Sequence, residues 1–293
     1  MLATVAVLGA AAVAIKGAAP VPSWFVAETL SDDGDPLASW FANRTEHGLH
    51  ERRAQKWSQY LHPYHRHLHK FRGKEITLVE MGVQSGGSLH MWMDYFGDKA
   101  RIYGVDIDSR VRVVEGDRPG RVKVFIGDQG DPEFLRGLCK QIGRIDFVLD
   151  DASHIPWHQI MGVEMLFPCL NPDGGVYMVE DLGTDSHHVG KAANESIVAY
   201  AHAKAAELQV DTRPEVLARH PRQAPITMWQ RQLRSVHAYG SLVVFEKIRE
   251  RRHFALDAGQ VTIPKRTVGF VGLSRDKAEA RAEQLRKGEN LWV

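Results

Sequence analysis

The sequence contains few of the residues that mark several specialised classes of protein. Its 293 residues include only 2 cysteines, Cys139 and Cys169, which are too few for a disulfide framework and lack the paired spacing of a thiolate zinc site. Such sparing use of cysteine favours a reducing compartment. The 26 glycines and 13 prolines are too few for a collagen-like or low-complexity chain.

An excess of charge of either sign is also absent. The 37 basic and 36 acidic side chains give a formal net charge of +1, and 44% of the residues are hydrophobic. This apolar fraction excludes a disordered chain, and the near-neutral balance supplies no overall field to attract a nucleic acid. We therefore expect a soluble globular protein with one large domain, with or without a small appendage, and with no nucleic-acid partner.

The apolar run at the amino terminus is too short for a comfortable transmembrane helix. Residues 2–15 are apolar apart from Thr4, whereas a membrane span needs about 20 residues. No Lys or Arg precedes the run, as it would in a signal peptide. Three interpretations stay open: a targeting or membrane-anchor segment, an interfacial or partner helix, and a helix packed on the body. The sequence otherwise predicts a cytoplasmic protein.

The rest of the chain predicts an α/β fold. We divide the sequence into an apolar segment (1–22), a helical cap (23–72), an α/β domain (73–250) and a charged tail (251–293). Five short apolar runs predict parallel strands, with helix-compatible stretches such as 88–95 and 132–142 between them. A hairpin around Gly240 adds an antiparallel edge, so we expect a doubly wound, mostly parallel seven-stranded sheet. The predicted strands are 76–82, 101–106, 122–128, 145–150 and 175–180, and the hairpin strands are 234–239 and 241–248; residues 36–72 are predicted to be helical.

Acidic residues stand at the end of every predicted parallel strand. They are Glu80, Asp106, Asp128, Asp150 and Glu180, with Asp151 and Asp181 directly after the last two. Ligands of open parallel sheets bind outside the carboxyl ends of the strands. Any one of these residues could simply cap a helix, but five in register are harder to explain in that way.

The loop after the first strand narrows the class of ligand. Its glycines allow a ligand to approach the backbone, but Gln84 stands where the dinucleotide fingerprint requires glycine. Asp106 would accept hydrogen bonds from ribose hydroxyls. Glu80 would repel a pyrophosphate and attract an ammonium or sulfonium group. These preferences suit S-adenosyl-L-methionine.

These motifs carry a resemblance to a known family. Glu80-x-Gly82-x-x-x-Gly86, Asp106 and Gly127-Asp128-Gln129 resemble class I S-adenosylmethionine-dependent methyltransferases. The segments 149–154, 179–181 and 235–242 are similar to the metal-dependent macrolide and rhamnosyl sugar O-methyltransferases of the mycinamicin type. The likeness covers about residues 55–248, and it implies a Rossmann-like methyltransferase domain over 73–250.

The resemblance implies a role for each matching residue. It places magnesium on Asp151, Glu180 and Asp181, and it makes His154 the general base. The residues that it places around S-adenosyl-L-methionine are Glu80, Gly82, Gln84, Ser85, Gly86, Ser88, Asp106, Asp128, Gln129 and Asp150. Carboxylates are the oxygen ligands that Mg²⁺ prefers, and a divalent cation with a neutral imidazole is the chemistry that activates a sugar hydroxyl.

Several alternatives stay open. His154 alone could be a hydrogen-bonded loop histidine, and the fold could survive as a non-catalytic S-adenosylmethionine-binding scaffold. An NAD oxidoreductase and a nucleic-acid base methyltransferase lack their motifs. The histidines between His62 and His69 could hold a soft transition metal, although such clusters are more often surface groups. Residues 183–235, which should face the acceptor, contain no motif that identifies which sugar or glycoside it is. Whether the protein self-associates is also left open.

Overall fold

The computed structural model describes residues 35–47, 52–182, 196–210 and 226–251. All of them belong to one compact unit, Met1–His253. The apolar segment 2–15, most of 183–235 and the tail beyond residue 251 lie outside the described residues. Within the described part, no helix is both long and apolar enough to cross a membrane.

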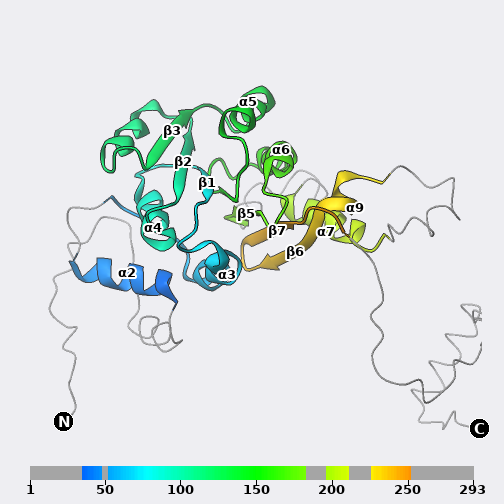
Figure 1. Cartoon of the computed structure of the whole chain (residues 1–293), viewed down its shortest axis with the longest axis horizontal. Helices are drawn as coiled ribbons and strands as arrows, with labels where there is room; N and C mark the ends of the chain where they lie inside the picture. The colour runs from blue at the N-terminus through cyan, green and yellow to red at the C-terminus, as the bar shows by residue number, and fades with distance from the viewer. Residues whose placement is uncertain (1–34, 48–51, 183–195, 211–225, 252–293) are drawn as a thin grey trace, which may run out of the picture. The chain divides into compact units, whose positions relative to one another are not determined.

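A seven-stranded sheet forms the centre of this unit (Figure 1). Its order is β3-β2-β1-β4-β5-β7-β6; the first five strands are parallel to one another, and β7 is antiparallel to both β5 and β6. The strands are β1 (Thr77–Met81), β2 (Arg101–Asp106), β3 (Val122–Ile126), β4 (Phe147–Asp150), β5 (Val176–Glu180), β6 (Leu233–Tyr239) and β7 (Leu242–Lys247). The predicted α/β fold with its antiparallel hairpin is confirmed.

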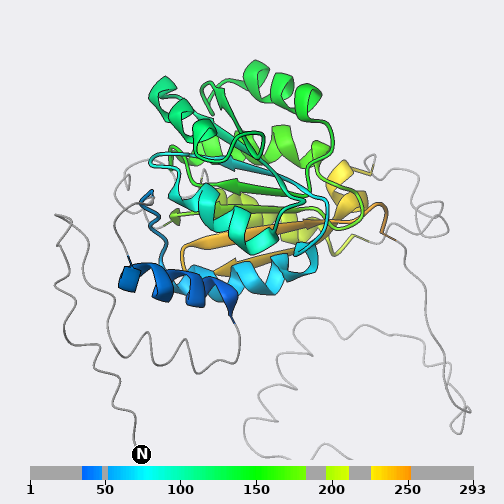
Figure 2. The same ribbon diagram turned by 60° about the vertical axis from the view of Figure 1, so that its left-hand side comes forward.

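Helices cover both faces of the sheet, because successive residues of each strand point to opposite sides. Leu78 belongs to the hydrophobic cluster that includes side chains of α2, α3 and α4, whereas its neighbour Val79 belongs to the cluster that includes those of α5, α6 and α7. Figure 2 shows α2 and α3 on one side of the sheet and the green helices on the other. The described helices are α2 (Pro36–His47), α3 (Ser58–Leu68), α4 (Gly87–Phe96), α5 (Pro132–Ile142), α6 (Pro156–Leu166), α7 (Ile197–Glu207) and α9 (Met228–Gln232), with short 3-10 turns η1 (His69–Phe71), η2 (Ser109–Gly116) and η3 (Phe167–Cys169).

Local sequence signals account for the helix that follows β3. The Asp131 carboxylate accepts hydrogen bonds from the backbone N–H groups of Glu133 and Phe134, and Pro132 occupies the first turn, where its missing N–H costs nothing. The helix ends at Gly143. These signals explain why the predicted bounds of 132–142 match α5.

The prediction that residues 36–72 are helical is wrong for part of that stretch. Residues 52–57 form no helix. A side chain added at Gly87 would come within 2.2 Å of the Arg53 carbonyl carbon, so this segment runs directly against the start of α4. Tertiary contact with α4 therefore overrides the helix propensity of the segment.

The two cysteines also differ from the expectation of a reduced chain. Cys139 of α5 and Cys169 of η3 form a disulfide, with their Cα atoms 6.0 Å apart. The two cysteines are 30 positions apart in the sequence, and the chain between them includes β4 and α6, which fold back so that η3 lies beside α5. The spacing of the two cysteines in the sequence does not predict this disulfide, because the fold brings α5 and η3 together through the connection from β4 to β5.

Candidate active site

A pocket of about 890 Å³ opens at the carboxyl ends of the parallel strands. The loops that follow β1 to β5 line it, and the segment 53–57 closes one side. This is the edge of the sheet at which the sequence predicted ligand binding. Its volume lies within the range of about 300–1,000 Å³ that is usual for small-molecule sites.

The loop from β1 to α4 takes a backbone conformation that requires glycine at one position. Gly82 has φ of +93°, and a Cβ atom there would lie 2.1 Å from the carbonyl oxygen of Asp151. The loop is fixed from the neighbouring strand, because Asp106 Oδ2 accepts hydrogen bonds from the backbone N–H groups of Val83 (2.9 Å) and Gln84 (3.1 Å). Asp106 therefore holds the loop in place and also lines the pocket.

Most of the residues predicted to bind the cofactor line this pocket. They are Gly82, Gln84, Ser85, Ser88, Asp106, Asp128 and Gln129. Three others do not line it. Glu80 and Asp150 are fully buried, and Gly86 directly precedes α4, where an added Cβ would meet the side chain of Val114.

Asp150 points into the protein interior. Its Oδ2 atom accepts hydrogen bonds from Gln129 Nε2 at 2.6 Å and from the Tyr177 hydroxyl at 3.2 Å. Burial raises the pKa of the Asp150 carboxyl to about 7, although both donors oppose the shift. Gln129 also accepts a hydrogen bond from Ser153, so this buried pair ties the loop after β3 to the loop after β4.

Asp151, His154 and Asp181 come together at the pocket wall. His154 Nε2 lies 4.0 Å from Asp151 Oδ1 and 3.9 Å from Asp181 Oδ2, and one donor atom from each residue falls within 4.8 Å of the others. His154 and Asp181 have φ angles of 54° and 56°, which residues other than glycine rarely adopt. Backbone strain of this kind is concentrated at functional sites.

Glu180, the third predicted magnesium ligand, lies deeper. Its side chain is buried, and its two carboxylate oxygens accept hydrogen bonds from the Tyr64 hydroxyl and from Lys56 Nζ. Burial raises the pKa of Glu180 to about 7, and the charge of Lys56 opposes that shift. In this arrangement the carboxylate points toward Lys56 and not toward His154.

Lys56 is a central residue that the sequence analysis did not identify. Its ammonium group is buried, 2.5 Å from Asp151 Oδ2, 2.9 Å from Glu180 Oε2 and 3.7 Å from Glu80 Oε1. We call Glu80, Asp151 and Glu180 the carboxylate cluster. Burial by itself would lower the pKa of Lys56, but the carboxylate cluster outweighs burial and holds this pKa well above its ordinary value.

Two tyrosines of α3 complete the arrangement. The Tyr60 hydroxyl lies 2.7 Å from Asp181 Oδ1, and the Tyr64 hydroxyl contacts Glu180. Tyr60 and Tyr64 are four residues apart on α3, so they lie on one face of that helix. That spacing is the signal in the sequence for the two tyrosines, whereas Lys56 lies before α3 in a segment that is not helical, so helical spacing does not predict its position.

Comparison with known proteins agrees with this geometry. No protein-family model matches the chain. It is 44% identical over 140 residues to the 8-demethyl-8-alpha-L-rhamnosyl tetracenomycin-C 2'-O-methyltransferase of Streptomyces olivaceus, covering 45% of this chain and 35% of that protein. It is 33% identical over 199 residues to the demethylmacrocin O-methyltransferase of Streptomyces fradiae, covering 63% of this chain and 47% of that protein.

The same class of protein is found among solved structures. The MycE methyltransferase of the mycinamycin pathway, solved with Mg, SAH and mycinamycin VI, matches 73% of this chain and 53% of its own length, at 25% identity and a TM-score of 0.58. In sequence and in fold, this chain is similar to sugar O-methyltransferases. The chain spans about a third to a half of the length of the relatives above, so what those proteins do as a whole is not carried over directly.

Proposed function

We propose that this chain is an S-adenosyl-L-methionine-dependent and magnesium-dependent O-methyltransferase that acts on a hydroxyl of a sugar or glycosylated small molecule. The observation that carries the proposal is the convergence of Asp151, His154 and Asp181 at the wall of a pocket that also contains Asp106. Rhamnosyl and macrolide glycosides are the compounds named for the relatives, and they support this substrate class.

The pocket residues fit the proposed methyl donor. Asp106 offers its carboxylate to the ribose hydroxyls. Gly82 of the β1–α4 loop also lines the pocket, and any side chain there would clash with the backbone of Asp151. The rest of the donor would meet Gln84, Ser85, Ser88 and Asp128. Gln129 also lines the pocket, with its side chain held by Asp150 and Ser153. Glu80 and Asp150 would act from behind the pocket, through the groups that they contact, and Gly86 through the start of α4.

The carboxylates fit a divalent cation. Asp151, Glu180 and Asp181 supply oxygen ligands only, the type that Mg²⁺ prefers. Asp151 Oδ2 and Glu180 Oε2 both face the ammonium of Lys56, which a cation bound to these two oxygens would displace, whereas Asp151 Oδ1 and Asp181 Oδ2 face His154. A bound Mg²⁺ would lower the pKa of an acceptor hydroxyl and orient its oxygen.

The part of His154 in the proposed reaction is to take a proton. Its imidazole, with Nε2 directed at Asp151 and Asp181, accepts the hydroxyl proton as the acceptor oxygen attacks the methyl carbon. A carbon–oxygen bond forms while the carbon–sulfur bond breaks, and the sulfur keeps the electron pair of that bond. The proton then resides on the imidazole, beside Asp151 and Asp181.

Methyl transfer to a panel of rhamnosides and macrolide glycosides, followed by mass spectrometry, tests the proposal. We expect a product that is one methyl group heavier, formed only with magnesium. Asp181→Asn should abolish this transfer and keep S-adenosylmethionine affinity in calorimetry, because Asp181 belongs to the metal ligands. Donor binding without transfer to any panel member would favour the scaffold alternative, and full activity after exhaustive chelation would exclude the metal.

A further inference from the structure

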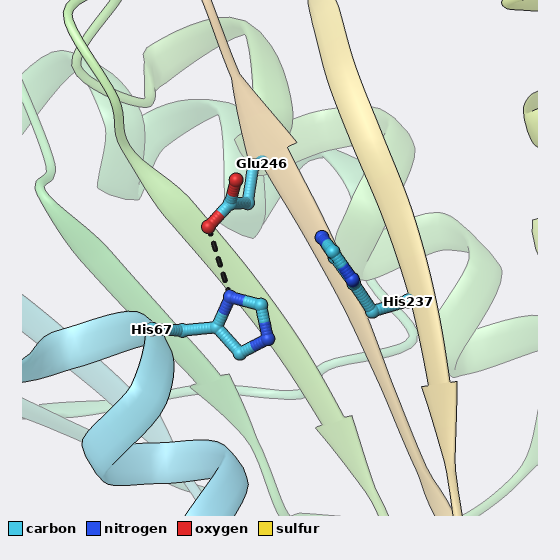
Figure 3. Close-up of side chains that lie close together, drawn as sticks. All are labelled: His67, His237 and Glu246. Carbon is cyan, nitrogen blue, oxygen red and sulfur yellow. Dashed lines mark hydrogen bonds and ion pairs between the residues drawn. The ribbon is translucent and has the colours of Figure 1, made fainter.

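A second group of metal-type ligands lies outside the pocket, where α3 meets the β6–β7 hairpin. His67 of α3, His237 of β6 and Glu246 of β7 each offer one ligand atom, and these atoms lie within 4.8 Å of one another. Figure 3 shows the three side chains close together, with His67 in contact with Glu246. None of them lines the pocket described above.

The hairpin register explains how the two strands contribute to one group. Ser235 of β6 is paired with Glu246 of β7, so these two side chains share a face of the sheet. Alternation along β6 places His237 and Tyr239 on that same face. Helix α3 covers this face and brings in His67, which is 4% exposed.

Of the histidines between His62 and His69, only His67 joins this group. His65 Nδ1 lies 2.9 Å from the Tyr95 hydroxyl, and His69 Nδ1 contacts the backbone carbonyls of His65 and Arg66. The candidate ligands are therefore assembled by the fold, and the local cluster in the sequence does not hold a metal by itself.

Outer hydrogen bonds orient the ligands. His67 Nδ1 lies 2.9 Å from Glu246 Oε1, and His67 Nε2 lies 2.8 Å from the Tyr239 hydroxyl. A tyrosine hydroxyl both donates and accepts, so it can accept from an Nε2–H while Nδ1, once it has lost any proton shared with Glu246, binds the metal. The Ser235 hydroxyl donates to Glu246 Oε2 at 3.1 Å and holds the carboxylate.

We propose that His67, His237 and Glu246 bind a divalent transition-metal ion of the zinc type. Two imidazoles and one carboxylate form a donor set used for Zn²⁺, with a fourth position left for water, and imidazole favours such ions over Mg²⁺. Two cations face the group: Lys70 Nζ lies 3.9 Å from Glu246 Oε1, and the charge of Arg66 acts on His237. The Lys70 side chain is 35% exposed, so it can turn toward solvent. The ion would fasten α3, and with it Tyr60 and Tyr64, to the hairpin.

Zinc titration of the untagged full chain by calorimetry, in excess Mg²⁺, tests the proposal. Asp151→Asn with Asp181→Asn serves as the parent, because it removes the other group of potential ligands. We expect one bound zinc per chain. His237→Gln and Glu246→Gln should each weaken binding by more than about tenfold, a loss that removal of even an outer partner can cause. His69→Gln, on an exposed histidine of η1, is the matched control and should leave the affinity unchanged.

Thermal unfolding supplies a second readout. Zinc should raise the unfolding midpoint of the parent and of His69→Gln, and it should not raise that of His237→Gln or Glu246→Gln. Circular dichroism establishes that each variant is folded, and either of the two ligand variants suffices for the comparison. A parent that binds no zinc, or ligand variants that bind it as tightly as the parent, would overturn the proposal.

Discussion

At the pocket wall, the effect of a single substitution on stability depends on whether it leaves a buried charge without its partner. Lys56 is the cation that neutralises the carboxylate cluster, and its side chain is 2% exposed. Lys56→Met removes this cation and leaves the buried Glu80 and Glu180 without it. We expect the free energy of unfolding to fall by roughly 3–5 kcal/mol, the usual effect of breaking a buried ion pair. Urea denaturation at neutral pH measures the change.

A double variant separates the loss of charge balance from the loss of packing. Lys56→Met combined with Glu180→Gln should recover part of the stability, because the second substitution removes one of the carboxylates left unpaired. The Glu180→Gln single variant supplies the comparison. If Glu180→Gln lowers the stability of Lys56→Met by as much as it lowers the stability of the parent protein, the two residues are not coupled in the way the geometry indicates.

His154 is best tested by a substitution that respects its backbone. Its φ of 54° favours asparagine over most other replacements, so His154→Asn removes the imidazole without adding backbone strain. We expect methyl transfer to slow by roughly 100- to 10,000-fold, the usual contribution of a general base, and the acidic limb of the pH–rate profile to flatten. Rates measured across pH with saturating magnesium check both effects.

The matched control is His62→Asn, on an exposed histidine of α3 that does not line the pocket. It should keep the parent rate and the parent pH profile. A His154→Asn protein with the same rate and the same acidic limb would show that His154 is a structural loop residue.

At the scale of elements, the β1–α4 loop packs against the backbone of Asp151 and so helps to fix the position of that residue. Gly82→Ala would place a methyl group 2.1 Å from the Asp151 carbonyl oxygen at a φ of +93°. Positive φ and overpacking each cost about 1–3 kcal/mol, so we expect a loss of roughly 2–6 kcal/mol in the free energy of unfolding. Thermal and urea denaturation measure this loss, and the rate of methyl transfer should fall with it.

Gly137→Ala is a control with the opposite expected sign. Gly137 lies inside α5 with nothing within 4 Å of an added Cβ, so alanine there should raise stability by about 0.5–1 kcal/mol. Equal effects of the two substitutions would mean that the close approach of Gly82 to Asp151 does not constrain the loop.

The elements themselves could be predicted because their signals are local. The strand over 101–106 and the helix over 132–142 have the predicted bounds, and the predicted strand over 122–128 ends two residues early, at the turn that Gly127 and Asp128 begin. The cap that positions α5, the apolar runs and the hairpin around Gly240 are all contained in short stretches of sequence.

The details of the candidate site depended on long-range contacts and could not be predicted in the same way. Lys56 meets Asp151 and Glu180 across 95 and 124 residues, and no periodicity reports such a contact. Both Asp150 and Asp151 are predicted from the sequence to lie in the site. Neighbouring residues at a strand end point to opposite sides, so strand alternation alone could have indicated that the two do not both face the pocket.

For the molecule as a whole, the sheet edge that forms the pocket carries a cost in stability. The carboxyl ends of β1, β4 and β5 bring Glu80, Asp150 and Glu180 into the interior, and all three are buried. Lys56 compensates the two glutamates. Among the described residues, Asp150 has no ion-pair partner within 4 Å and is held by neutral donors alone.

Asp150 should therefore make the stability of the protein depend on pH. Its pKa is raised from 3.8 to about 7 by burial, so between those values the folded protein binds more protons at this site than the unfolded chain. The free energy of unfolding should fall as pH rises through this window, by at most about 1.4 kcal/mol per pH unit from this group, and then level off above pH 7. Asp150→Asn keeps a neutral side chain of the same shape at every pH and should remove this slope.

Urea denaturation of both proteins from pH 4 to pH 9 distinguishes this contribution from all others. The difference in stability should shift in favour of Asp150→Asn as pH rises toward 7, and above about pH 8 the two curves should run parallel. Because every other titrating group is common to both proteins, its effect cancels in the difference. A difference that stays constant from pH 4 to pH 9 would show that Asp150 is ionised in the folded protein throughout, and that Gln129 and Tyr177 stabilise its charge despite its burial.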